Sequence, residues 1–194
     1  HEVLSFEYRL APEHHFPAPL EDVTKAWDYL MHLGYGARDI VVAGDSAGGN
    51  LALVLTMLLR DAGRLLPRRL VLMSPWIDMT ASGKSYRERR DADPMITMNY
   101  IQAVRAACAP GRELSSPMLS PLFGDFDRFP PVLIQVGTNE ILMSDSVRLR
   151  DRLVQAGIPC RLEVWPDMWH VFQMFPMKKA SQAMDSVGRF LLET

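Results

Sequence analysis

The sequence predicts an α/β fold, in which a mostly parallel sheet carries helices on both faces. Two patterns lead to this prediction. Short apolar runs rich in β-branched residues and leucine alternate with longer segments in which apolar residues recur at helical spacing, and glycine, proline or polar residues bound each run. Such alternation is typical of parallel sheets covered by helices. A chain of 194 residues can build one substantial core, so we expect residues 1–194 to form a single domain.

Five short apolar runs are predicted strands. They cover residues 3–8, 40–43, 70–73, 132–136 and 161–165. Two long irregular stretches, residues 74–98 and 109–131, separate the later strands. Loops of that length tend to shape a binding site, so we expect them to lie around one.

Five segments with helical spacing or a long apolar run are predicted helices. They cover residues 20–31, 50–59, 99–107, 147–154 and 178–192. The segment 50–59 is too long and too apolar for another strand. Glycines at positions 34, 63 and 157 are normal stop signals for three of these helices.

Composition argues against several classes of protein. The formal net charge is −2 and charges of both signs are scattered, so nothing favours binding to nucleic acid or to an anionic membrane surface. The longest apolar stretch, residues 51–59, is about half the length of a membrane span. Cys108 and Cys160 have no metal-type spacing, so we expect buried reduced thiols and a cytoplasmic location.

The sequence GDSAGGN at residues 44–50 is the most informative segment. It contains Gly-x-Ser-x-Gly between a predicted strand and a predicted helix. This setting is typical of a nucleophile elbow, a tight turn that exposes a reactive serine. Small residues at Gly44 and Gly48 would let the strand and the helix pass closely. Ser46 is therefore the candidate nucleophile, and the alternative is a Gly-Ser turn that only caps a buried helix.

A nucleophilic serine needs a base to take its proton and an acid to orient that base. Among the five histidines, His170 follows the predicted strand 161–165 by a short turn. That position lies beyond the carboxyl end of a parallel strand, as Ser46 does, and ligands bind at this edge in open α/β sheets. We predict that His170 is the general base. The alternative is a loop histidine packed between Trp169 and Phe172.

Two carboxylates follow the predicted strand 132–136, at Glu140 and Asp145. Asp145 comes directly after Ser144, a good helix N-cap, and a helix N-terminus that favours negative charge would explain its presence. Glu140 lies closer to the strand end and lacks such an explanation. We therefore favour Glu140 as the acid over Asp145, with Asp78, after a different strand, as a third choice.

With these residues, the chain resembles the hormone-sensitive-lipase-like branch of the α/β-hydrolase esterases, the bacterial carboxylesterases called family IV. The order serine, acid, histidine is the one expected of α/β hydrolases, and the resemblance covers essentially the whole chain. The shared motifs are Tyr8-Arg9-Leu10-Ala11-Pro12-Glu13, GDSAGGN, Ser74-Pro75-Trp76-Ile77-Asp78, Leu119-Ser120-Pro121, Pro130-Pro131 and residues 167–170.

The resemblance also bears on single residues. The family's acid is usually an aspartate in an Asp-Pro-Leu turn, and here Glu140-Ile141-Leu142 stands in its place, as glutamate does in some members. Arg9 and Glu13 are expected to be ion-pairing scaffold residues rather than catalytic ones.

One family feature is missing from this sequence. Family members carry a His-Gly-Gly-Gly motif upstream of the elbow, whose backbone N–H groups build most of the oxyanion hole, and none precedes Gly44 here. Of that hole only the Ala47 N–H would remain, and losing one donor costs about 10² to 10³ in rate. The family's cap helices are absent too. So is the strand that, in the family's sheet, lies between the strands formed here by residues 3–8 and 40–43. The resemblance therefore implies the C-terminal part of a longer esterase, without the N-terminal strands and cap.

The expected function is hydrolysis of short- to medium-chain acyl esters through an acyl-enzyme, with Ser46, Glu140 and His170 as the triad and no metal or organic cofactor. The partner is a small-molecule ester, and the resemblance suggests pairing of two copies through the last strand and helix. Four side chains could line the substrate cleft, although such residues near strand ends are more often core. They are Trp76, Met168, Trp169 and Phe172.

Other functions fit the same residues. An amidase, a peptidase or an acyltransferase could use the same triad. A non-catalytic receptor is an alternative from another class, because plant hormone receptors of this fold resemble the family but lack its catalytic histidine. His170 is retained here, which argues against a receptor. A third alternative is an inert truncated product.

Overall fold

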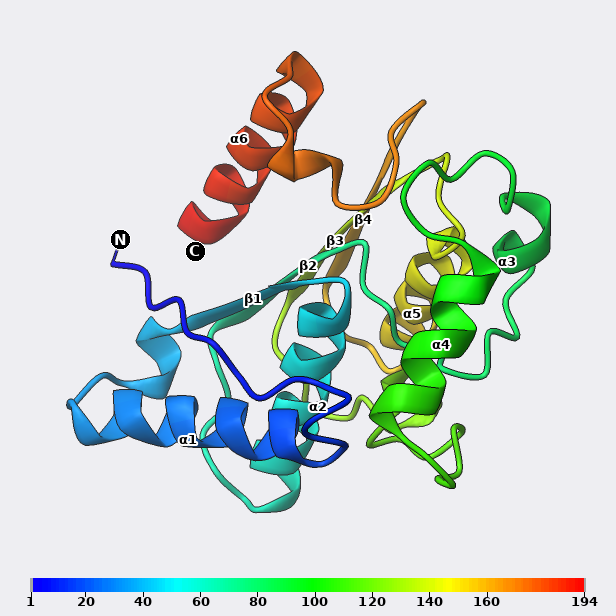
Figure 1. Ribbon diagram of the computed structural model, residues 1–194. Helices are drawn as coiled ribbons and strands as arrows, with labels where there is room; N and C mark the ends of the chain where they lie inside the picture. The colour runs from blue at the N-terminus through cyan, green and yellow to red at the C-terminus, as the bar shows by residue number, and fades with distance from the viewer. Residues whose placement is uncertain (1, 194) are drawn as a thin grey trace.

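A four-stranded parallel sheet forms the centre of the computed structural model, which describes residues 2–193 (Figure 1). The strands are β1 (Val41–Asp45), β2 (Arg69–Met73), β3 (Val132–Gly137) and β4 (Cys160–Trp165). Their order in the sheet is β1-β2-β3-β4, the same as in the sequence, and every neighbouring pair is parallel. The carboxyl ends of all four strands therefore meet at one edge of the sheet.

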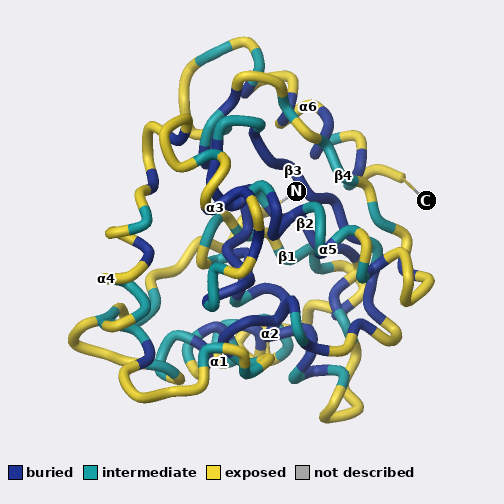
Figure 2. The backbone as a smooth tube through the Cα atoms, turned by 90° about the vertical axis from the view of Figure 1, so that its right-hand side faces the viewer, coloured by how far each residue is buried: buried dark blue, intermediate teal, exposed yellow. Residues whose placement is uncertain are grey.

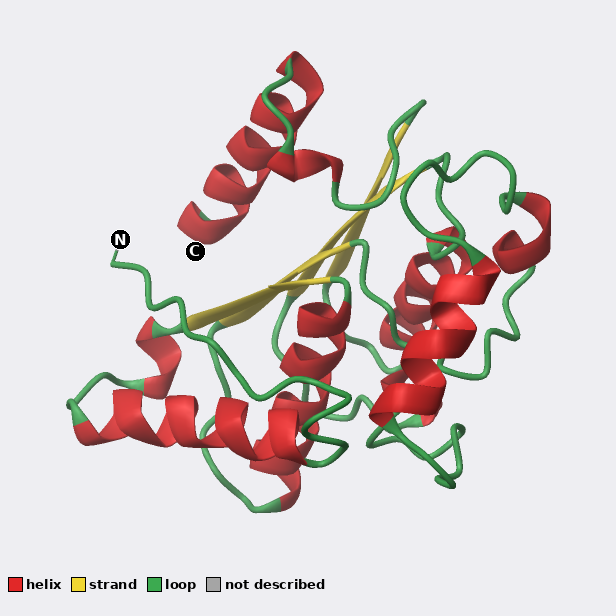
Figure 3. Ribbon diagram, viewed as in Figure 1, coloured by secondary structure: helices red, strands yellow, loops and turns green. Residues whose placement is uncertain are grey.

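Helices lie on both sides of this sheet (Figure 3). Six α-helices and three short 3-10 helices lie within residues 2–193. They are α1 (Ala18–His32), α2 (Ala47–Asp61), α3 (Ser85–Glu88), α4 (Met98–Cys108), α5 (Met143–Gln155), α6 (Lys178–Leu192), η1 (Ala37–Asp39), η2 (Pro121–Phe123) and η3 (Phe172–Met174). In the described chain, α2 and α5 cover one face of the sheet and α6 covers the other.

The core sits on both faces of the two central strands. Successive strand side chains point to opposite faces. On one face Leu72 of β2 packs in a cluster with Leu53 of α2 and Leu149 of α5. On the other face Val71 packs in a cluster with Phe190 of α6. Strands covered on both faces read as continuous apolar runs, and Figure 2 shows β2 and β3 as buried.

The prediction of a strand at residues 3–8 is wrong. The segment has no ladder hydrogen bonds and runs as a loop (Figure 3), with Val3 88% and Phe6 42% exposed. A strand needs a neighbour to pair with its N–H and C=O groups. Within residues 2–193 no strand pairs with this segment, so its backbone N–H and C=O groups make no strand ladder.

Arg9, directly after this segment, is an ion-pairing scaffold residue as expected. Its guanidinium lies 2.8 Å from carboxylate oxygens of Glu21 and Asp22 on α1. The hydrogen bonds from Arg9 lower the pKa of Asp22 to about 2. Among the described residues Glu13 forms no ion pair, so the same expectation for Glu13 is wrong.

The other predicted elements are present, and α6 has the predicted bounds. Cys108 and Cys160 are free thiols as expected, though only partly buried, and burial raises the pKa of Cys160 to about 12. Within residues 2–193 no helix has the length and apolar character needed to cross a bilayer.

Candidate active site

The segment around Ser46 is a tight turn from β1 into α2. Ser46 has φ 50° and ψ −116°, a backbone conformation that non-glycine residues rarely adopt. A Cβ atom on Gly44 would lie 2.3 Å from the carbonyl carbon of Gly48, so only glycine fits where the strand passes the helix. The Ser46 N–H donates to Met73 O (3.0 Å), which attaches the turn to the end of β2. The local geometry is that of the predicted elbow.

Glu140 and His170 are hydrogen-bonded to each other. Nδ1 of His170 lies 3.2 Å from Oε2 of Glu140, and Glu140 has no exposed surface while the His170 side chain is 7% exposed. A carboxylate oxygen can only accept, so Nδ1 carries the hydrogen and Nε2 is left as the acceptor. The pair forms because β3 and β4 are neighbours in register, with Gly137 opposite Trp165, and each residue follows its strand by a short turn.

Ser46, Glu140 and His170 all follow carboxyl ends of strands in one sheet, β1, β3 and β4. The structure brings the acid and the histidine into contact. Within residues 2–193 it contains no hydrogen bond between the Ser46 hydroxyl and His170, so that contact stays a prediction. Ala47 is the first residue of α2, where backbone N–H groups have no partner inside the helix. Among residues 2–193 the Ala47 N–H has no hydrogen-bond partner, which suits the predicted role of oxyanion donor.

Ser74, which the sequence did not single out, belongs to this site. It follows β2, is fully buried, and its hydroxyl donates to Oε1 of Glu140 (2.9 Å) and accepts from the Val171 N–H (3.0 Å). Glu140 Oε1 also accepts the Gly137 N–H at 2.5 Å. The available signal was its position at the end of β2 and at the start of the motif Ser74-Pro75-Trp76-Ile77-Asp78.

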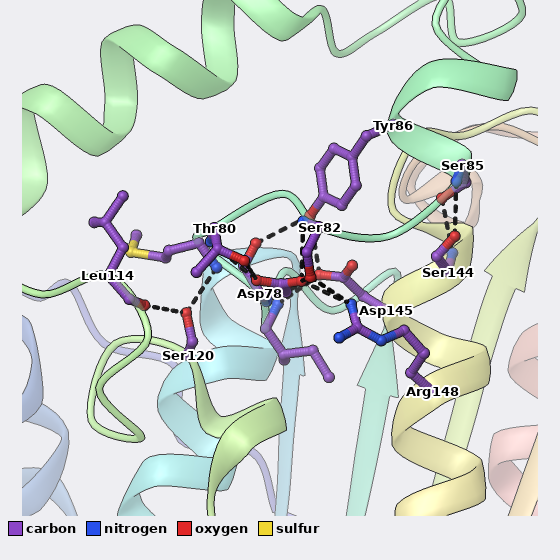
Figure 4. Close-up of polar contacts among 12 residues, drawn as sticks. Asp78, Thr80, Ser82, Ser85, Tyr86, Leu114, Ser120, Ser144, Asp145 and Arg148 are labelled. Carbon is purple, nitrogen blue, oxygen red and sulfur yellow. Dashed lines mark hydrogen bonds and ion pairs between the residues drawn. The ribbon is translucent and has the colours of Figure 1, made fainter.

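Asp78 and Asp145, the two other candidate acids, lie in a separate polar cluster (Figure 4). Asp78 accepts hydrogen bonds from Ser82, Thr80 and Arg148, and the Arg148 Nη1–Asp78 Oδ2 distance is 2.7 Å. Burial acts to raise the pKa of Asp78, but these hydrogen bonds outweigh it and lower the pKa. Neither carboxylate contacts His170 among the described residues.

Asp145 is fully buried, and the expectation that Ser144 caps its helix is wrong. Helix α5 begins at Met143, so Ser144 lies inside it, and its hydroxyl accepts the N–H of Ser85 rather than one of its own helix. Asp145 Oδ2 instead accepts the N–H groups of Ile77 (3.1 Å) and Asp78 (3.0 Å). Asp145 therefore holds the loop after β2 against α5, a structural role that neighbouring residues in the sequence do not reveal.

Burial is the main cause that raises the pKa of Asp145 to about 8, and the nearby charge of Asp78 adds to it. Asp145 Oδ1 is buried and has no hydrogen-bond partner in the described part of the chain. Burying an oxygen without a hydrogen-bond partner costs more free energy when the carboxyl group is ionised than when it is protonated. Burial therefore favours the protonated form of Asp145 in the folded protein.

We expect Asp145→Asn to change how stability depends on pH. Between about pH 4 and pH 8 the folded wild type keeps a proton on Asp145 that the unfolded chain releases, so its free energy of unfolding falls as pH rises. Asparagine binds no such proton. In urea denaturation, the free energy of unfolding of Asp145→Asn minus that of wild type should grow from pH 4 to 8 and then level off. A difference independent of pH would contradict the raised pKa. Asp185→Asn, on the exposed side of α6, is the control.

The four side chains proposed to line a substrate cleft lie in two apolar clusters. Trp76 packs with residues of the loops and α4, and Met168 and Phe172 pack beneath α6. Trp169 is partly exposed and its ring packs edge-on against Phe175, with centroids 5.5 Å apart. Trp169 is thus the most accessible of the four, and the burial of the others fits a core role.

Known proteins resemble this chain over nearly its whole length. Residues 1–174 match the family model described as alpha/beta hydrolase fold. The chain is 35% identical over 192 residues to an esterase of Acinetobacter venetianus, covering 97% of this chain and 63% of that protein. It is 35% identical over 191 residues to an acetyl-hydrolase of Streptomyces hygroscopicus, covering 97% and 64%.

Solved structures resemble the chain as well. The crystal structure of an esterase from the bacterial hormone-sensitive lipase family matches with a TM-score of 0.93 and 41% identity, covering 95% of this chain and 63% of that one. The chain thus spans less than two thirds of the length of these relatives.

Proposed function

This chain belongs to the alpha/beta hydrolase fold family, and from that premise we propose that the protein is a serine carboxylesterase with Ser46, His170 and Glu140 as its triad. The observation that carries the proposal is the buried hydrogen bond between Glu140 and His170, at the same sheet edge as the elbow of Ser46. The names of the relatives, esterase and acetyl-hydrolase, support the same class of reaction.

The proposed reaction is acyl transfer in two steps. Nε2 of His170 takes the proton of the Ser46 hydroxyl as Oγ attacks the ester carbonyl carbon. The Ala47 N–H donates one hydrogen bond to the oxyanion of the tetrahedral intermediate, and the upstream His-Gly-Gly-Gly segment typical of the family would supply the other donors. The bond to the alcohol oxygen then breaks, and the alcohol leaves with the proton from His170. Water repeats the sequence on the acyl-enzyme and releases the carboxylic acid.

Glu140 acts on the imidazole in this scheme. Its Oε2 accepts the Nδ1 hydrogen, which keeps Nε2 free to take the serine proton. When that proton arrives, the imidazole becomes positively charged, and the buried carboxylate stabilises the charge. This is the work that the acid of a triad performs.

We also propose a substrate class, a domain organisation, a mode of pairing and a cellular location for the protein. Residues 1–194 form a single catalytic domain that acts on short- to medium-chain acyl esters and takes part in lipid metabolism. Trp169 contributes to the substrate cleft, with lesser contributions from Trp76, Met168 and Phe172. Two copies pair through β4 and α6. The free thiols of Cys108 and Cys160 suit a reducing cytoplasm.

A serine-directed fluorophosphonate tests the proposal. We expect one equivalent of label, located on Ser46 by peptide mass spectrometry, because only an activated serine reacts rapidly with such a probe. Ser115→Ala, a change on the exposed surface, should label like wild type. The protein should also hydrolyse 4-nitrophenyl butyrate faster than the matched anilide. Folded protein that neither labels nor hydrolyses the ester would point to the receptor or inert alternatives, and a faster anilide reaction to an amidase.

A further inference from the structure

We propose that Ser74 is a positioning residue, which holds the Glu140–His170 pair in its working arrangement at the end of β2. This inference rests on the proposed function, because it concerns how the acid and the base of the triad are held. Ser74 makes no contact that would place it on a substrate. Its effect passes through Glu140 and through the backbone next to His170.

The hydroxyl of Ser74 uses its hydrogen and a lone pair in two directed bonds. A serine hydroxyl has one hydrogen to donate and two lone pairs that accept. The hydrogen goes to Oε1 of Glu140 at 2.9 Å, and the oxygen accepts the Val171 N–H at 3.0 Å. One buried atom thus joins the acid to the residue that directly follows the base.

These bonds decide which carboxylate oxygen faces His170. Oε1 of Glu140 receives two donors, the Ser74 hydroxyl and the Gly137 N–H, so it is held away from the imidazole. Oε2 is then the oxygen presented to Nδ1 of His170. Without the Ser74 hydroxyl, a single donor would hold Oε1, and the carboxylate could turn in its pocket.

Backbone strain at both ends of the link supports a functional role. Ser74 has φ 47° and Val171 has φ 49°, in the left-handed region that side chains other than glycine disfavour, most of all β-branched ones. Strained residues persist where the surrounding structure fixes them, and they cluster at functional sites. The hydrogen bond between Ser74 and Val171 connects the two strained positions directly.

The end of β2 also holds the nucleophile. The carbonyl of Met73 accepts the Ser46 N–H at 3.0 Å, and the Ser74 N–H donates to Gln135 O in β3 at 2.8 Å. Met73, the last residue of β2, and Ser74, which follows it, therefore contact the segments that carry all three members of the proposed triad. Ser74 supplies the side chain that links the acid and the base within this arrangement.

Ser74→Ala tests the inference, with Ser120→Ala as the matched control. Ser120 is also a fully buried serine whose hydroxyl accepts a backbone N–H, from Met79, and donates to a carbonyl, that of Leu114, but it does not touch Glu140. We expect Ser74→Ala to lower kcat about 10- to 100-fold with little change in KM, the range for one lost hydrogen bond to a charged group. Ser120→Ala should keep kcat within about threefold of wild type. Ser74→Thr retains the hydroxyl and should recover most of the lost kcat.

A second readout does not depend on turnover. In protein labelled with ¹⁵N-histidine, the Nδ1–H proton of His170 should give a downfield NMR signal in wild type, assigned by its absence from His170→Ala. We expect this signal to shift or broaden in Ser74→Ala and to stay unchanged in Ser120→Ala. An unchanged signal and a wild-type kcat in Ser74→Ala would overturn the inference and leave the esterase proposal intact. A wild type that hydrolyses no ester, with a signal that still depends on Ser74, would overturn the esterase proposal alone.

Discussion

Replacing His170 by alanine is expected to lower kcat for ester hydrolysis about 10⁶-fold, the size of effect seen when a serine hydrolase loses its base. The Ser46 hydroxyl would then have no group to take its proton, and the leaving alcohol would have no proton donor. Initial rates with 4-nitrophenyl butyrate measure this loss. KM should change much less, because His170 acts on the reacting atoms.

A double variant tests whether Ser46 and His170 act together. Ser46→Ala should cost about as much as His170→Ala, and Ser46→Ala/His170→Ala should be no slower than either single variant, since the two residues act as one unit. His32→Ala is the control, because His32 is exposed on α1, and it should retain wild-type kcat. Losses that multiply in the double variant would show that His170 does not act on Ser46.

Glu140→Gln is expected to lower kcat about 10⁴-fold, as loss of the acid's charge does in other triads. The structure explains how so small a change acts. Ser74 and Gly137 both donate to Oε1 of Glu140, so the amide oxygen of a glutamine would take that position. Its NH₂ group would then face Nδ1 of His170, which would have to accept a hydrogen bond. The imidazole would carry its hydrogen on Nε2, the wrong tautomer for a base.

Kinetics and proton NMR together measure this effect. The kcat of Glu140→Gln should fall while its circular dichroism stays that of wild type, and the Nδ1–H signal of His170 should disappear. Glu13→Gln makes the same chemical change on an exposed loop residue and should leave kcat unaltered. Retention of more than a tenth of the wild-type kcat in Glu140→Gln would show that Glu140 is not the acid of the triad.

Elements whose evidence is local could be predicted well from the sequence. The strand predicted at residues 132–136 is observed as Val132–Gly137, and the helix predicted at 178–192 is observed with the same bounds, because apolar spacing and terminal breakers lie within each segment. The segment 3–8 failed for the opposite reason. Its pattern suits a strand, but a strand also needs a second strand to pair with. The sequence of the segment itself does not show whether such a partner is present.

The same difference between local and distant evidence applies to the candidate site. Ser46 and its turn could be predicted because the elbow pattern, the strand and the helix are contiguous. The sequence favours Glu140 over Asp145 partly through a helix cap at Ser144, which the structure lacks. The presence of a carboxylate at Asp145 is explained instead by its hydrogen bonds to the N–H groups of Ile77 and Asp78. Both residues lie more than sixty positions away in the sequence.

Ser74 joins partners that are far apart along the chain. Its bonds to Glu140 and to the Val171 N–H span 66 and 97 positions, so both require large loops to close first. Contacts of such range form slowly, after local turns such as the elbow. We therefore expect the Glu140–His170 pair to be completed late in folding, once the segments that follow β2, β3 and β4 have come together.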